Sequence, residues 1–270
     1  MPELPEVETI VRDLQELIPG TTIKNLQILR PNVIRGSDTI FKDNLIGKTF
    51  QSISRRGKNI IANMDSGLIL VVNLGMTGRL GLQQDDCLFT HPAIYFTLNI
   101  GKILVYDDVR RFGKLDIYSE QEWLDRSAQL GPEPLSPEYK HTDLHEKLNS
   151  SGSPIRSWLL DQKNVVGVGN IYANESLHLS GIHPQRPANR ITKTESQLLY
   201  KALRKILLSA IQNRGTTLRN YRDVSGKGGN NSSKLRIYGR HGENCLSCSD
   251  QVQRISFSNR SAFFCPSCQR

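Results

Sequence analysis

Four cysteines near the end of this 270-residue chain constrain its fold more than any other feature. They form two Cys-x2-Cys pairs, sixteen residues apart: Cys245, Cys248, Cys265 and Cys268. Pairs at this spacing are typical of zinc sites. Four thiolates complete a tetrahedral site and leave no open position, so we expect one structural Zn²⁺ and not a catalytic metal. The short stretch around the pairs cannot build its own core, so metal binding would hold it folded.

The fifth cysteine, Cys87, stands apart from these pairs, and we expect no role for it. The start of the chain lacks the basic region and apolar core of a secretory signal. No run approaches the ~18 apolar residues of a membrane span. We therefore expect a cytoplasmic, reducing location without membrane contact, where cysteines serve as metal ligands or free thiols more often than in disulfides.

Positive charge is concentrated in one part of the chain. The formal net charge is +9, and the segment from Lys201 to Arg240 holds ten Lys or Arg against one acid, Asp223. Charge gathered in this way indicates a polyanionic partner such as nucleic acid. A solvated helix face is the alternative explanation if no other feature indicates nucleic acid.

The spacing of apolar residues divides the chain into a β-rich and a helical part. Residues 7–18 have helical spacing, and Pro19-Gly20 would end that helix. Short β-like runs between Gly-rich turns follow as far as Tyr118 and favour a sandwich or barrel, with strands expected over 60–64, 68–73, 94–98 and 103–106. Beyond a proline-rich segment at 130–137, helices are expected over 142–149, 154–160, 170–179 and 193–213.

The first residues read Met-Pro-Glu-Leu-Pro-Glu and permit two interpretations. Proline suits the first turn of a helix, so Pro2 and Pro5 could simply start one. If Met1 is removed, Pro2 instead carries a free secondary amine. An α-amino group has a pKa of about 7.7–8.0, so a useful fraction is unprotonated at neutral pH. Amines of this kind attack sugar or carbonyl carbons and form Schiff bases. From these residues alone, the helix start is the simpler interpretation.

Three features of the chain occur together: the Pro2–Glu6 start, the Gly-Val-Gly-Asn-Ile-Tyr-Ala-Asn-Glu segment at 167–175, and the terminal cysteine pairs. In this order they resemble bacterial formamidopyrimidine-DNA glycosylases over essentially the whole chain. The resemblance implies a two-lobed α+β fold. An N-terminal β-sandwich carries the first helix, and a helix-two-turn-helix module with a zinc finger forms the second lobe, with DNA in the cleft. The expected boundaries are 1–131 for the catalytic lobe, 132–139 for a linker, 140–234 for the helix-two-turn-helix domain and 235–270 for the finger.

The resemblance also implies an activity. The family removes oxidised purines such as 8-oxoguanine and formamidopyrimidines in base-excision repair, as both glycosylase and abasic-site lyase. Pro2 matches its nucleophile, which attacks C1′ to form a Schiff base before β,δ-elimination, and Glu3 matches its general acid/base. Lys58 matches an active-site lysine on a hairpin. Glu6 matches a supporting residue, although an acid in the first turn also favours the helix dipole. Damaged double-stranded DNA is the expected partner of a monomeric, nucleoid-associated protein.

DNA contacts follow from the same resemblance. A damaged base must be extruded from the duplex, and apolar wedges commonly fill the vacated space. The family uses three void-filling residues, and one asparagine that holds backbone phosphates. Two arginines stand where the family usually has lysines, and another falls in the turn between the cysteine pairs, where phosphate contact and a solvated turn are both open. In this chain these residues are Met76, Arg110 and Phe112; Asn170; Arg156 and Arg219; and Arg260.

The segment from Arg222 to Lys234 departs from the family pattern. It lacks a Pro-Gly-aromatic sequence and is rich in Gly and Asn, which suggests mobility and leaves the base specificity open. Two alternative functions are an endonuclease VIII-like enzyme for oxidised pyrimidines and a non-catalytic zinc-finger protein that binds damaged DNA. Leu4 argues against the first, because that branch typically has glycine there. The second would need neither an amine at Pro2 nor a carboxylate at Glu3.

Overall fold

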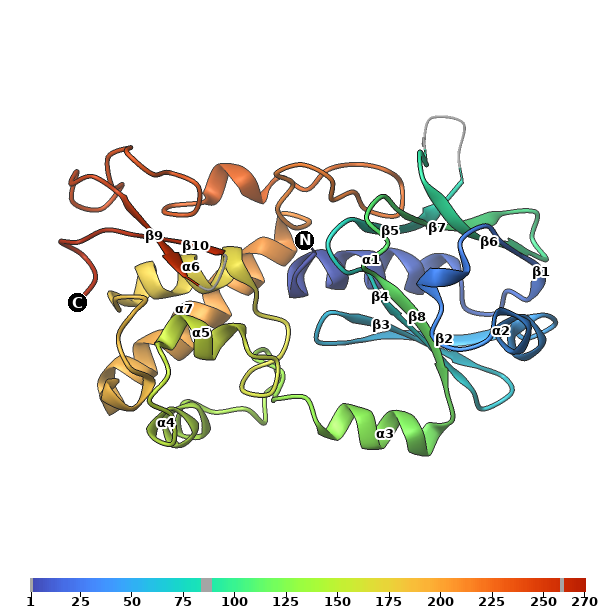
Figure 1. Ribbon diagram of the computed structural model, residues 1–270, viewed down its shortest axis with the longest axis horizontal. Helices are drawn as coiled ribbons and strands as arrows, with labels where there is room; N and C mark the ends of the chain where they lie inside the picture. The colour runs from blue at the N-terminus through green and yellow to red at the C-terminus, as the bar shows by residue number, and fades with distance from the viewer. Residues whose placement is uncertain (1, 84–88, 258–259) are drawn as a thin grey trace. The chain divides into compact units, whose positions relative to one another are not determined.

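The structure, a computed structural model, describes residues 2–83, 89–257 and 260–270 (Figure 1). These residues form two compact units. The first contains the chain up to Gln129 together with Ile211–Ser232, and the second contains Leu130–Ala210 and Ser233–Arg270. The chain therefore leaves the first unit, builds most of the second, and returns to the first before it ends in the second.

The first unit is a β-sandwich of two four-stranded antiparallel sheets, with strand orders β1-β6-β7-β5 and β2-β3-β4-β8. All four expected strands are present, with ends shifted by at most two residues. The strands are β1 (Ile23–Ile28), β2 (Phe50–Arg56), β3 (Asn59–Met64), β4 (Ile69–Asn73), β5 (Gly78–Leu82), β6 (Pro92–Leu98), β7 (Ile103–Asp108) and β8 (Lys114–Tyr118).

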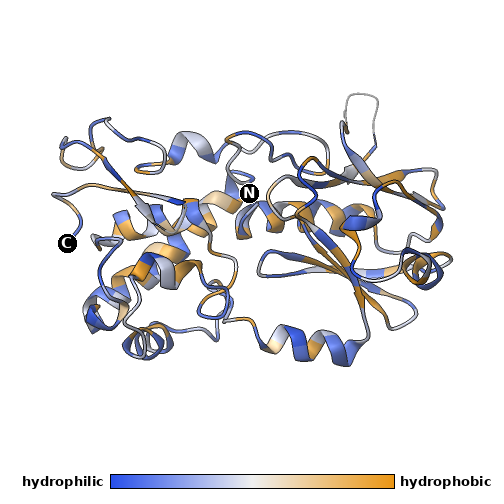
Figure 2. Ribbon diagram, in the orientation of Figure 1, coloured by the Kyte–Doolittle hydropathy of each residue, from blue (hydrophilic) through white to orange (hydrophobic). Residues whose placement is uncertain are grey.

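Helix α1 (Leu4–Leu17) places its apolar face in the core of this sandwich. Ile10 and Leu14 are at most 1% exposed and belong to the same buried cluster as apolar residues of both sheets. Hydrophobic and hydrophilic residues both occur along this helix, as expected for a helix with one buried face (Figure 2). The expected N-terminal helix is confirmed, and its burial fixes the start of the chain to the sandwich.

Two helices of the first unit were not expected from the sequence, α2 (Asp38–Leu45) and α3 (Glu120–Ala128). A serine caps each N-terminus by accepting a hydrogen bond from a backbone N–H, as short polar side chains commonly do. In α3 only Trp123 is buried. So few buried positions leave almost no apolar periodicity to recognise. A 3₁₀ turn, η1 (Pro31–Val33), lies between β1 and α2.

The segment 211–232 belongs to the first unit although it lies far along the chain. The Arg214 guanidinium binds Asp13 of α1 and Asp223, each at 2.7 Å. The N–H of Leu82 in β5 donates to the carbonyl of Val224. The helix-two-turn-helix domain was expected to run to residue 234, whereas packing assigns these residues to the sandwich. The expected boundaries stay a prediction, because a packing unit and a functional domain need not coincide.

The second unit is mainly helical and ends in a β-hairpin. The four expected helices are present, with buried leucines from each in one core. The proline-rich segment has no regular structure but is bonded to this unit, through Gly131 N–H to the Gln162 carbonyl and Arg204 to the Pro134 carbonyl, both at 2.8 Å. The elements are α4 (His141–Asn149), α5 (Ile155–Leu160), α6 (Asn170–Ser180), η2 (Ala188–Arg190), α7 (Lys193–Gln212, up to Ala210 in this unit), η3 (Asn231–Lys234, from Ser233), β9 (Gln253–Phe257) and β10 (Arg260–Phe264).

The two units together confirm the expected α+β class with an N-terminal sandwich and a helical C-terminal part. Among residues 2–83, 89–257 and 260–270, no helix is long and apolar enough to cross a membrane.

Truncating the core face of α1 should destabilise the first unit. We expect Leu14→Ala to lower its free energy of unfolding by about 2–5 kcal/mol, because a buried leucine is replaced by a cavity. The chain has two tryptophans, one in each unit. Urea unfolding followed by Trp123 fluorescence in a Trp158→Phe background therefore reports on the first unit. The exposed Glu16 on the same helix is the control. Glu16→Ala should change stability by no more than about 0.5 kcal/mol, and equal effects of the two variants would contradict the assigned core.

Candidate active site and DNA-contacting residues

The N-terminal residues expected to carry chemistry are buried at the start of α1. Pro2 and Glu3 are buried, and Glu6 is only 1% exposed. The Glu6 carboxylate accepts a hydrogen bond from the Glu3 N–H at 2.8 Å, and the two residues form a capping box at the helix start. Met1 lies outside the described residues, so its expected removal stays a prediction.

Glu6 also binds the segment that returns from the second unit. Its other carboxylate oxygen accepts the Thr216 N–H at 2.7 Å, and its carbonyl accepts the Tyr221 hydroxyl at 3.4 Å. Burial and the charge of Glu6 raise the pKa of Tyr221, which keeps the phenol protonated and able to donate. The carboxylate of Glu6 therefore holds the first turn of α1 against residues 216–221. No local sequence pattern indicates this contact, because more than two hundred residues separate its partners.

Lys58 lies half-buried on the turn between β2 and β3. The neighbouring Arg55 donates to the Gly57 carbonyl at 3.0 Å and to the carboxylate of Glu8 on α1 at 2.8 Å. Burial by itself would raise the pKa of Glu8, but hydrogen bonds from Arg55 and Arg12 outweigh it and hold the pKa below its usual value. This partly buried ion pair fixes the hairpin of Lys58 to the helix that follows Pro2 and Glu3.

The three residues expected to fill the void left by an extruded base lie on two loops of the first unit. Met76 is on the β4–β5 loop, and Arg110 and Phe112 are on the β7–β8 loop. Phe112 is 54% exposed and Met76 39%, so both belong to the large apolar residues that reach the surface. The Arg110 guanidinium lies 4.5 Å from the centroid of the Phe112 ring, within cation–π distance. Arg219 is exposed on the 211–232 segment.

In the second unit, Arg156 is not on the surface. It is 1% exposed and donates to the Asn170 side-chain oxygen at 2.6 Å and to the Ser261 carbonyl at 3.0 Å. Burial and the neighbouring charge of Arg260 lower its pKa. Asn170 begins α6, and its amide nitrogen also donates to Ser261, at 3.3 Å. Arg260 is exposed at the start of β10. Phosphate contact by these three residues stays a prediction, and Arg156 shows a second role, joining α5, α6 and the hairpin.

Two further residues of α6 hold the cysteine-bearing part of the chain. Glu175 is 2% exposed and accepts the backbone N–H groups of three successive residues at 2.8–3.0 Å, Arg236, Ile237 and Tyr238. Asn174 accepts the N–H of Phe263 in β10 at 2.7 Å. The sequence motif that ends at Glu175 was recognised, but its carboxylate had no assigned role. Only the fold shows which amides it receives.

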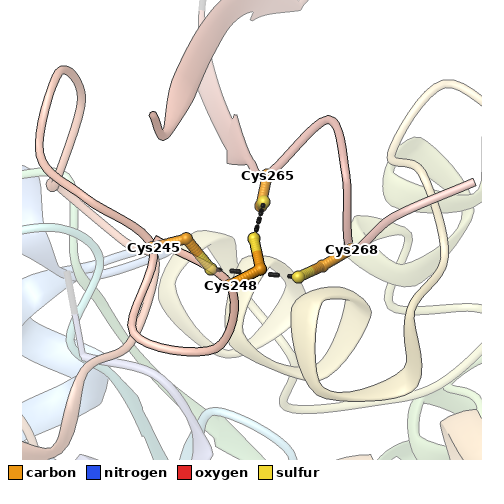
Figure 3. A group of neighbouring side chains, drawn as sticks. All are labelled: Cys245, Cys248, Cys265 and Cys268. Atoms are coloured by element: carbon orange, nitrogen blue, oxygen red, sulfur yellow. Dashed lines mark hydrogen bonds between the residues drawn. The ribbon is translucent and has the colours of Figure 1, made fainter. Parts of the chain in front are cut away.

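The four cysteines meet in one cluster (Figure 3). Their Sγ atoms all lie within 4.8 Å of one another, with 3.3 Å between Cys248 and Cys265 and 4.0 Å between Cys245 and Cys268. A tetrahedral ion with Zn–S bonds near 2.3 Å would hold its sulfur ligands about 3.8 Å apart. The cluster therefore fits a tetrahedral metal ion, and the expected ligand set is brought together. Cys87 lies outside the described residues.

The Gly- and Asn-rich segment after Arg222 is extensively hydrogen-bonded. The Asp223 carboxylate accepts the N–H groups of Ser225 and Lys227, at 3.1 and 2.8 Å. Asn231 is 4% exposed and donates to the Thr216 hydroxyl at 2.8 Å. These bonds tie the segment to residues next to the Glu6 contact. Its expected mobility stays a prediction, and its bonds show that it has a defined conformation in this structure.

Comparisons with known proteins agree with this architecture. The family model described as formamidopyrimidine-DNA glycosylase N-terminal domain matches residues 1–115, and the one described as formamidopyrimidine-DNA glycosylase H2TH domain matches residues 130–222. Formamidopyrimidine-DNA glycosylases of Desulforamulus reducens and Chloroflexus aggregans are 42% and 38% identical to the chain. Both alignments cover 100% of this chain and at least 98% of the relative.

Solved structures of Lactococcus lactis Fpg superpose closely. Its complex with DNA containing an abasic site has a TM-score of 0.93 at 34% identity, covering 99% of each chain. Its complex with Fapy-dG-containing DNA has a TM-score of 0.92 at 34% identity, covering 99% of this chain and 100% of the other.

The sandwich, the helical unit and these matches together define a DNA glycosylase of DNA repair. The chain belongs to the formamidopyrimidine-DNA glycosylase family. The resemblance recognised in the sequence is confirmed.

The contact between Glu6 and Thr216 can be tested by hydrogen exchange. In Glu6→Gln, a side-chain NH2 replaces one acceptor oxygen and faces a backbone N–H, so one buried hydrogen bond is lost. Such bonds to a charged group contribute about 1.5–3 kcal/mol. We therefore expect the amides of residues 214–220 to exchange about 10- to 100-fold faster by mass spectrometry. Glu16→Gln on the exposed side of α1 is the control. Unchanged exchange in Glu6→Gln would show that the carboxylate does not hold this segment.

Proposed function

We propose that this chain is a bifunctional DNA glycosylase and abasic-site lyase that removes oxidised purines through a Schiff base on Pro2. The observation that carries the proposal is the burial of the adjacent Pro2 and Glu3, with the backbone of Glu3 held by Glu6. A nucleophile and an acid/base group must be held in place to act on one atom. The first turn of α1 provides that rigidity.

In the first step, the Pro2 amine attacks C1′ of the damaged nucleotide once Met1 has been removed. The bond from C1′ to the base nitrogen breaks, and the base leaves with the electron pair and a proton. Glu3 is the residue next to the nucleophile that can supply and later accept protons. The nitrogen loses its own proton, and the C1′–O4′ bond of the sugar ring then breaks as the C1′=N⁺ iminium forms, with O4′ taking up a proton. The enzyme and the opened sugar are now covalently joined.

In the second step, the iminium acidifies the C2′ proton. Its removal expels the 3′ phosphate by β-elimination, and a further elimination expels the 5′ phosphate. Water then hydrolyses the iminium and regenerates the Pro2 amine. Lys58 lies on the hairpin that Arg55 holds. We propose that it lies beside a phosphate of the DNA, where its positive charge would stabilise the departing phosphate.

Damaged double-stranded DNA is the proposed substrate. Relatives of known structure, 34% identical, are described in complex with DNA containing an abasic site or Fapy-dG. Extrusion of the lesion would leave a space for Met76, Arg110 and Phe112, two of which are exposed apolar side chains. The proposed phosphate contacts are Asn170, Arg156, Arg219 and Arg260, and each unit supplies some of them.

Zinc is the proposed metal of the cysteine cluster. Four thiolates close enough to bind one ion tetrahedrally are typical of structural zinc sites. When bound, the ion cross-links two short segments that lack a sizeable core. The chain's own residues then hold this part to α6, through the amides that Glu175 and Asn174 accept.

Borohydride trapping tests the proposed chemistry. With DNA containing 8-oxoguanine opposite cytosine, we expect reduction of the iminium to give a stable covalent complex, seen as a shifted band in a denaturing gel. Pro2→Gly, and a variant that retains Met1, should both impair excision of the base. Glu3→Gln should slow it by about 10²- to 10⁴-fold, as expected for loss of a general acid/base.

The trapping panel also separates the alternatives. Glu16→Gln, an exposed acid of the same helix, is the control for Glu3→Gln and should trap normally. Preferred trapping with an oxidised pyrimidine would assign the chain to the endonuclease VIII type. If no lesion or abasic site gives a covalent complex, the enzyme proposal is wrong and a non-catalytic binder is favoured.

Loss of one cysteine should release the metal. We expect Cys265→Ser to lower the zinc content, measured by plasma mass spectrometry, from about one equivalent towards zero and to abolish tight DNA binding. Cys87→Ser is the matched control and should retain both. Tight binding by metal-free Cys265→Ser protein would refute the structural role of zinc.

A further inference from the structure

The β4–β5 and β7–β8 loops approach each other closely through their backbones. They carry the proposed void-filling residues Met76, Arg110 and Phe112, which we call the wedge residues. A Cβ added at Gly75, next to Met76, would lie 2.5 Å from the backbone nitrogen of Gly113, next to Phe112. Such a distance is too short for any side chain, so only glycine allows the loops to come this close. The wedge residues therefore stand on one surface formed by two distant parts of the sequence.

Asp108, at the end of β7, lies under both loops. It is 1% exposed, and each of its two oxygens accepts two hydrogen bonds. One oxygen receives the Thr77 hydroxyl at 2.5 Å and the Arg110 N–H at 3.2 Å. The other receives the Gly113 N–H at 2.9 Å and the Tyr106 hydroxyl at 3.3 Å. One carboxylate thus binds Thr77 of the β4–β5 loop and both sides of Phe112.

Two backbone N–H groups and two hydroxyls occupy the acceptor positions of the Asp108 side chain. A carboxylate that is ionised accepts only, and backbone N–H groups donate only. Burial and the nearby charge of Asp108 raise the pKa of Tyr106, so its hydroxyl remains a donor. The Thr77 hydroxyl donates to Asp108 and accepts the Arg110 N–H at 3.1 Å, which closes a small network between the loops.

The same network continues to the hairpin of Lys58. Asn73 accepts the Gly75 N–H at 3.0 Å through its side-chain oxygen and donates to Asn59 at 2.9 Å through its amide nitrogen. Asn59 in turn donates to the Arg56 carbonyl at 3.1 Å. Two loops and one hairpin, all in the first unit, are therefore joined by side-chain hydrogen bonds.

We propose that Asp108 is a positioning residue that holds the two loops together as a single wedge. This inference rests on the proposed function, because it assigns a use to the void-filling residues. Unstacking and unpairing a base costs a few kcal/mol. Loops that insert between bases must therefore keep their conformation against this unfavourable energy. Without the Asp108 carboxylate, the loops that carry Met76 and Phe112 would move apart when these side chains insert between bases. Asp108 touches no DNA in this scheme and acts through the side chains it positions.

The test compares Asp108→Asn with its neighbour Asp107→Asn. The Asp107 side chain is also 1% exposed, but its carboxylate accepts the N–H of His91, a residue that precedes β6 and belongs to neither loop. We expect Asp108→Asn to slow single-turnover excision of 8-oxoguanine from duplex DNA by about 10- to 100-fold, the loss that corresponds to hydrogen bonds to a charged group. Asp107→Asn should stay within about threefold of wild type.

A second reaction separates positioning from general damage to the fold. Cleavage of a single-stranded oligonucleotide with a preformed abasic site needs no base extrusion, so Asp108→Asn should cleave it at the wild-type rate. Thr77→Val removes the hydroxyl with little change of shape and should reproduce the duplex defect. In a Phe112→Ala background the effect of Asp108→Asn should largely vanish, because both changes disable one wedge.

Three results would overturn the inference: wild-type excision by both Asp108→Asn and Thr77→Val, an equal defect in Asp107→Asn, or additive effects with Phe112→Ala. A readout without catalysis keeps this separate from the proposed function. Fluorescence of 2-aminopurine beside an abasic site rises when the stack opens, and Asp108→Asn should reduce that rise for bound DNA. If wild-type protein opens the stack but excises no base, the proposed function fails while the wedge is still tested.

Discussion

The burial of one face of α1 in the sandwich is the interaction on which the rest of the site depends. Leu14 and Ile10 join a core shared by both sheets, so the helix cannot shift without opening that core. Glu3 is the N-cap of this helix and Pro2 precedes it, and Arg55 binds the Lys58 hairpin to the helix through Glu8. A helix held in this way gives a chain terminus, which is usually mobile, the fixed position that covalent chemistry requires.

Three buried carboxylates each join two segments of the chain through hydrogen bonds. Glu6 joins the start of α1 to Thr216, Asp108 joins the two wedge loops, and Glu175 joins α6 to the start of the cysteine-bearing part. Each accepts backbone N–H groups from segments that lack regular secondary structure, and Asp108 also accepts the Tyr106 hydroxyl from β7. An ionised acceptor satisfies more donors than a neutral side chain and forms stronger hydrogen bonds. This chain thus uses acids in structural positions as well as in the proposed chemistry.

Much of the fold could be predicted because the local spacing of apolar residues indicates its helices and strands. The α1 periodicity, the strands around 60–64 and 94–98, and the four helices of the second unit all appear where apolar spacing placed them. Helices α2 and α3 were missed because they bury too few residues to make a pattern. The burial of Arg156 could not be predicted either, because a basic residue in a helix is usually exposed. Its partners, Asn170 and the Ser261 carbonyl, become neighbours only in the folded chain.

The sequence by itself determined the family, the cysteine ligand set and the candidate nucleophile, because each depends on residue type and spacing along the chain. The tertiary structure decided which groups meet: Thr216 with Glu6, Thr77 with Asp108, and the amides of 236–238 with Glu175. These partners lie from about thirty to over two hundred residues apart. Hydrogen bonds are short-ranged and depend on direction, so no local pattern records them, and only the packed backbone specifies which donor reaches which oxygen.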